Sequence, residues 1–102
     1  MNEIQAWEHL AKKWDKPHIC KSGRAVVDMS DDAYFCLNLC QSIVYLHSRD
    51  QITEGLYHRM ESTALAFNTR KCDQKFPFTK AGARMRASFC RDQAAKLKRK
   101  KP

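Results

Sequence analysis

The chain has 102 residues, which is enough for one domain with a single hydrophobic core. Apolar residues make up 43% of it, yet no stretch approaches the roughly 18 uncharged apolar residues that a membrane helix needs. The N-terminal MNEIQAWEHL lacks the basic flank and apolar run of a secretory signal. We therefore expect a cytoplasmic protein without a membrane partner.

The net charge of +8 is concentrated in the last third of the chain. Residues 1–68 hold seven Lys or Arg against nine Asp or Glu, whereas residues 69–102 hold twelve against two. Such asymmetry points to an anionic partner. Nucleic acid, or a complex of nucleic acid and protein, is the partner that this composition favours.

The first predicted element is a helix over residues 2–14. Asp15-Lys16-Pro17 should end it, because a residue before proline avoids helical backbone angles. Trp7 and Trp14 share its apolar face and are expected to be core anchors, with docking of a partner through an exposed pair as the alternative. The apolar face recurs at helical spacing and consists of Ile4, Trp7, Leu10, Ala11 and Trp14.

Residues 18–29 are predicted to form a loop that turns at Ser22-Gly23. The segment Ala25-Val26-Val27 could be extended. So long a connector should be held to the core by apolar side chains, and the candidates are Ile19, Val26, Val27 and Met29.

The central element is predicted to be one buried helix from Ser30 to His47. Ser30 can cap its start, and Asp31 and Asp32 place negative charge on the first turn, where the helix dipole favours it. Apolar residues follow on most sides of the helix, as expected for a buried one. The inward positions are Ala33, Cys36, Leu37, Cys40, Ile43, Val44 and Leu46.

Two more helices are predicted. Ser48-Arg49-Asp50-Gln51 matches a capping box, with Asp50 as the competing cap. The helix from about residue 51 to Phe67 should fold back antiparallel to the central one. Thr79 should cap the last helix, which is expected to run to about Leu97. One face of this helix is a stripe of small residues, which allows another helix to approach closely. The fold class is therefore all-α, a single-domain bundle of four main helices over residues 1–97, followed by a basic disordered tail at 98–102.

Four basic residues of the last helix, Lys80, Arg84, Arg91 and Lys98, fall within a sector about 40° wide at the helical period. Arg70 and Lys71 extend this charge into the preceding loop. Phosphate backbones bind such surfaces without reading sequence; a solubilising face is the alternative. Reversing Arg84 and Arg91 to Glu is expected to abolish binding and leave the melting temperature unchanged, because both side chains should point to water.

A second function remains open. The protein could be an inhibitor or adaptor that docks on another protein through an apolar patch, with the basic tail serving only solubility. The candidate docking residues are Trp7, Trp14, Met85 and Phe89. Salt dependence would separate the two functions, because phosphate contacts weaken steeply with added salt.

Catalysis and metal binding have little support. The sequence contains no phosphate-cradling glycine loop, nucleophile elbow or HExxH motif, so we expect no enzyme, no cofactor and no small-molecule substrate. The odd number of cysteines, five, and the absence of CxxC predict reduced thiols. A zinc site is the less favoured alternative, and its ligands would be His18, Cys20, Cys36 and Cys40.

Three motifs follow one another along the chain, in the segments LCQSI, ITEGLYHRM and FPFTKAGARMRASFCRDQAAKL. The order and spacing of these motifs resemble those of a loose group of small helical accessory proteins encoded by tailed phages and prophages. The resemblance covers roughly the C-terminal two thirds of the chain. It implies a setting in a bacterial cytoplasm and an action on host machinery, such as inhibition of a nucleic-acid-guided defence.

Overall fold

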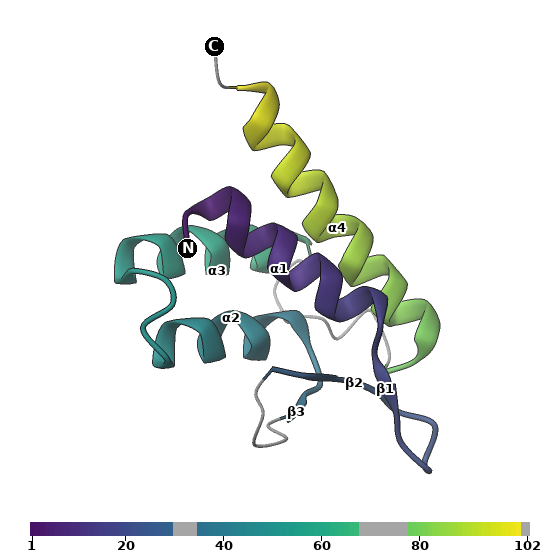
Figure 1. Ribbon diagram of the computed structural model, residues 1–102. Coiled ribbons are helices and arrows are strands. Elements are labelled where there is room, and N and C mark those ends of the chain that lie inside the picture. The colour runs from purple at the N-terminus through teal and green to yellow at the C-terminus, as the bar shows by residue number, and fades with distance from the viewer. Residues whose placement is uncertain (30–34, 68–77, 101–102) are drawn as a thin grey trace.

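The computed structural model describes residues 1–29, 35–67 and 78–100. Within these ranges the fold is mostly helical, with a small antiparallel sheet in addition to the four predicted helices (Figure 1). The all-α prediction is therefore correct for the helices and wrong in omitting the sheet. The elements are α1 (Glu3–Asp15), β1 (His18–Ile19), β2 (Ala25–Asp28), β3 (Phe35–Cys36), α2 (Leu39–Ser48), α3 (Glu54–Phe67) and α4 (Lys80–Arg99).

Helix α1 forms as predicted and supplies the two largest fully buried side chains, those of its tryptophans. Asn2 and Gln5 cap it reciprocally: the Asn2 side chain accepts from the Gln5 backbone N–H at 2.8 Å, and the Gln5 side chain accepts from the Asn2 N–H at 2.9 Å. Trp7, Leu10 and Trp14 are fully buried. Because both tryptophans are inaccessible, the exposed-pair alternative is wrong.

The loop predicted for residues 18–29 is a β-hairpin. Its turn includes Gly23, whose φ of 88° is a left-handed value that favours glycine. Strand β2 lies between β1 and β3, and Val26 and Val27 are buried as predicted. Ile19 does not enter the core, because it sits on the edge strand and is 38% exposed.

The predicted central helix is wrong in its first half. Helix α2 begins only at Leu39, because Asn38 caps it by accepting from the Gln41 N–H at 2.8 Å while Gln41 accepts from the Asn38 N–H. Phe35 and Cys36, predicted to be helical, pair with β2 instead. Val44, predicted to face inward, is exposed, and Leu37 is half-buried. The proposed cap at residues 30–32 lies outside the described residues.

Helices α2 and α3 pack side by side and antiparallel, as predicted (Figure 1). The predicted capping box at Ser48–Gln51 is wrong. Asp50 takes a left-handed φ of 58°, and Thr53 caps α3 by accepting from the Leu56 N–H at 3.2 Å.

Helix α4 is capped by Thr79, as predicted, and packs along α1 through its small residues (Figure 1). Ala83, Ala87, Cys90 and Ala94 are buried, which allows the two helix backbones to approach closely. The helix continues to Arg99, so Lys98 and Arg99 are helical and not part of a disordered tail. The α1–α4 pair and the α2–α3 pair thus form two layers, with the sheet at the end where α1 stops and α4 starts.

Candidate nucleic-acid interface

The four basic residues predicted to form a ridge on α4 do lie on its exposed side, but they do not act as one group. Arg91 donates to Asp15 Oδ1 at 2.6 Å, and this hydrogen bond raises the pKa of the arginine. Lys98 Nζ lies 2.7 Å from Glu8 Oε2. Both acids belong to α1. These two cations therefore tie α4 to α1, and their charge is largely compensated.

Lys80 and Arg84 form no salt bridge within the part of the chain that the structure describes. Both line a hollow with Lys16, the C-cap of α1. Its remaining lining residues are Asp15, Pro17 and Ile19. Because Asp15 is already bonded to Arg91, the charge of Lys16, Lys80 and Arg84 in this hollow is not neutralised by it. The predicted loop cations, Arg70 and Lys71, lie outside the described residues.

A second hollow adjoins the first, because Lys16 and Pro17 line both. It adds two lysines from the last turn of α1. Its lining residues are Lys12, Lys13, Lys16, Pro17, His18 and Asp28. We call Lys12, Lys13, Lys16, Lys80 and Arg84 the basic surface.

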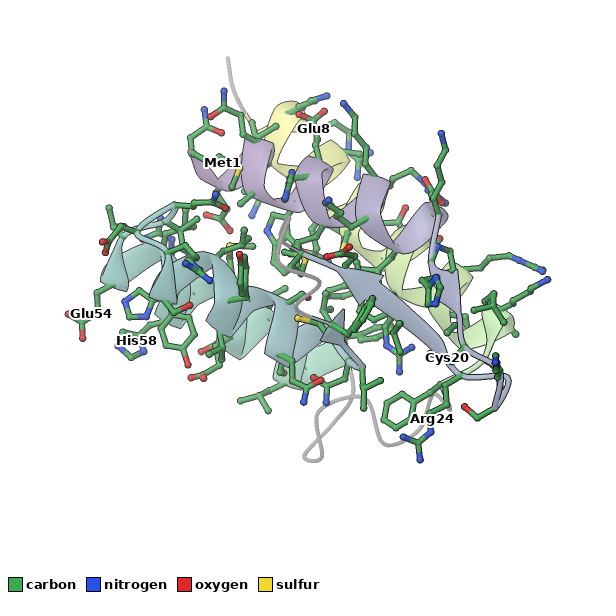
Figure 2. All side chains as sticks on the ribbon, turned by 60° about the horizontal axis from the view of Figure 1, so that its bottom comes forward. Met1, Glu8, Cys20, Arg24, Glu54 and His58 are labelled. Atoms are coloured by element: carbon green, nitrogen blue, oxygen red, sulfur yellow. The ribbon has the colours of Figure 1, made fainter. Side chains whose placement is uncertain are left out.

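Two lysines of the basic surface act on His9, a neighbouring residue of α1. Burial lowers the pKa of His9, and the charges of Lys13 and Lys12 lower it further. Both effects disfavour the protonated form of the imidazole. The end of the molecule that carries the hairpin residues Cys20 and Arg24 lies opposite the end that carries Glu54 (Figure 2). The basic surface adjoins the hairpin, because Ile19 and His18 of β1 line its two hollows.

Sequence reasoning missed the α1 half of this surface. The signal was present as Lys12-Lys13 and Lys16 within five residues. It was hidden because the first two thirds of the chain have a net negative charge when counted along the sequence. Packing of α1 against α4 brings the two groups of cations together, and charge counting cannot reveal this packing.

The residues predicted to dock another protein are mostly unavailable. Phe89 is half-buried, and its ring packs edge-on against Trp7 at 5.8 Å and near Phe67 at 4.2 Å. Both tryptophans are core residues. Met85, 47% exposed, is the one member of the predicted set that remains open to solvent.

Arg86 is a basic residue whose role the sequence did not indicate. It is fully buried, and its guanidinium lies 5.0 Å from the centre of the Trp14 ring and 5.9 Å from that of Phe78. A guanidinium over two aromatic faces is stabilised by cation–π attraction. Arg86 therefore fixes the start of α4 against the end of α1, and it contributes no surface charge.

The structure does not bring the four candidate zinc ligands together. Among the described residues, no group of three or more His, Cys, Asp or Glu is placed to hold a metal ion. Cys36 is buried, and desolvation raises the pKa of its thiol to about 12. His18 stacks on Phe35, with ring centres 5.6 Å apart.

None of the described helices is long and apolar enough to cross a membrane. Comparisons with protein-family models, with curated proteins and with solved structures found no match.

Proposed function

We propose that this protein is a non-enzymatic nucleic-acid-binding protein whose phosphate contacts come from the basic surface. The observation that carries the proposal is the convergence of five cations from α1 and α4 on two adjoining hollows. None of the five forms a salt bridge to another described residue, whereas Arg91 and Lys98 are paired with acids of α1. Uncompensated cations on a shared surface attract a polyphosphate backbone and release its counterions.

The biological setting extends this proposal. In keeping with the phage-protein resemblance, the protein would act as an accessory protein in a bacterial cytoplasm, on nucleic acid or on a host nucleic-acid–protein complex. Inhibition of a nucleic-acid-guided defence is one such action. Docking on a protein through an apolar patch is the weaker proposal, because three of its four candidate residues are buried or half-buried.

Charge reversal within the basic surface tests the function. In fluorescence anisotropy with a labelled oligonucleotide, Lys16→Glu with Arg84→Glu should weaken binding by about tenfold or more, since phosphate contacts are replaced by repulsion. The logarithmic dependence of affinity on salt should also become shallower by about 0.7 per lost contact for a single strand.

The matched control is Arg49→Glu with Lys96→Glu, which changes the net charge equally at exposed positions outside the basic surface. It should bind much more tightly than the Lys16/Arg84 variant. Equal weakening by both variants would mean that the attraction is diffuse, and the basic surface would be rejected. Absence of salt-dependent binding by the wild type would reject the function itself.

A further inference from the structure

Two aromatic rings lie on one face of the sheet, next to the basic surface. His18 pairs with Val26, and Phe35 pairs with Asp28, in the antiparallel register. Paired residues, and residues two apart on one strand, project from the same face of a sheet. His18 and Phe35 therefore point to the same side although they belong to the two edge strands.

The rings meet across the central strand. Their centres are 5.6 Å apart and their planes are inclined by 27°, which is a stacked arrangement. Phe35 is 45% exposed and His18 is exposed. Phe35 is the only phenylalanine or tryptophan exposed to this degree among the residues that the structure describes. Val26 lies on the same face of the central strand and is only 3% exposed, so the strand between the two rings is well packed.

The lysines at the end of α1 lie beside the His18 side of this pair. His18 lines the same hollow as Lys12, Lys13 and Lys16. Asp28 is the one carboxylate among the six lining residues of that hollow, which still leaves a net positive charge. An aromatic platform therefore adjoins a group of cations, the combination by which proteins hold single-stranded nucleic acid.

We infer that the ligand of this site is an unpaired nucleotide strand, with one base stacked on the Phe35–His18 pair and neighbouring phosphates on Lys12, Lys13 and Lys16. This inference rests on the proposed function and specifies which class of nucleic acid the protein binds. In a duplex the faces of the bases are covered by their neighbours in the stack, so the rings could not reach them. Stacking does not depend on base identity, and we expect little sequence preference.

An abasic strand separates stacking from phosphate contact, because it has the same number of phosphates and no bases. Wild-type protein should bind an oligo-dT strand about tenfold more tightly than an abasic strand of equal length, as expected for one stacked base. Phe35→Leu should remove this difference and leave binding of the abasic strand unchanged. Val44→Ala is the matched control, since Val44 is also 45% exposed and lies on α2; it should keep the difference.

A tryptophan reporter provides a second measurement that does not depend on loss of function. In Phe35→Trp the new indole should be quenched by oligo-dT and not by the abasic strand, whereas Trp7 and Trp14 are fully buried and should respond to neither. Equal affinity of the wild type for both strands, or a preference for oligo-dT that survives in Phe35→Leu, would overturn the inference and leave the basic surface intact. If neither strand nor a duplex binds in a salt-dependent manner, the proposed function fails as well.

Discussion

Capping side chains decide at which residue each helix of this chain begins. Thr79 was predicted as a cap and is one, whereas Asn38 and Thr53 were missed. Serine, threonine, asparagine and aspartate are all good caps, and residues 30–53 contain many of them. The preference of single residues for the cap position therefore does not select among them. Asn38 prevails because Gln41 stands three residues later and returns a hydrogen bond.

Two glycines should respond in opposite ways to replacement by alanine. Gly55 lies in the first turn of α3, and a Cβ there would meet only the end of the Arg59 side chain, at 3.9 Å. Gly55→Ala should therefore stabilise the fold by up to about 1 kcal/mol. Gly23→Ala should destabilise it by about 1–2 kcal/mol, because φ of 88° is strained for any residue with a Cβ. Urea unfolding measures both.

Each glycine variant serves as the control for the other, since both add one methyl group at an exposed position. Destabilisation by Gly55→Ala would mean that α3 begins later than Glu54. A neutral Gly23→Ala would contradict the left-handed turn of the hairpin.

At the scale of elements, the existence of the four helices could be predicted, whereas the start of α2 and the sheet could not. The helices have 10–20 residues and carry several repeats of an apolar period, whereas β1 and β3 are two residues long and contain no measurable alternation. Only Ala25-Val26-Val27 gave a signal of extended structure. Phe35 and Cys36 fit a helical stripe equally well, so their pairing with β2 depends on tertiary contacts that the sequence does not display.

The corrected start of α2 changes which truncations should matter. Ile43 is fully buried in α2, whereas Leu37 precedes the helix and is half-buried. Ile43→Ala should cost about 2–5 kcal/mol of unfolding free energy, as cavity-forming truncations do, and Leu37→Ala should cost clearly less. Chemical denaturation followed by circular dichroism measures the difference. Equal large losses would favour the uninterrupted helix from Ser30 that the sequence suggested.

At the scale of the whole molecule, the basic surface depends on how distant segments are paired. The sequence identified Lys80 and Arg84 correctly as exposed cations of α4. It could not show that acids of α1 bind Arg91 and Lys98, 76 and 90 residues away. Ion pairing thus excludes Arg91 and Lys98 from the group of uncompensated cations. Helix packing adds Lys12, Lys13 and Lys16 to that group. The net charge of the last third pointed to α4 and gave no indication of the α1 half of the basic surface.

The pairing of Arg91 also changes the expected result of charge reversal on α4. Arg91→Glu should lower the melting temperature, because it places a carboxylate against Asp15 across the α1–α4 contact. Arg84→Glu, with the same charge change and no ion pair to another described residue, should leave the melting temperature nearly unchanged. The double variant Arg84→Glu/Arg91→Glu is therefore a poor test of binding, although the sequence alone suggested it.

Asp15→Arg combined with Arg91→Glu provides the decisive comparison, since it rebuilds the ion pair with its charges exchanged. This swapped variant should recover most of the melting temperature lost in Arg91→Glu. Added salt should narrow the gap between Arg91→Glu and the wild type, because the pair is about half exposed, with side-chain exposures of 52% and 45%, and exposed charges are screened. If Arg91→Glu and Arg84→Glu melt at the same temperature at low salt, the Arg91–Asp15 pair contributes nothing to holding α4 on α1. The other contacts between the two helices, including the small-residue stripe and the Lys98–Glu8 salt bridge, would then be sufficient.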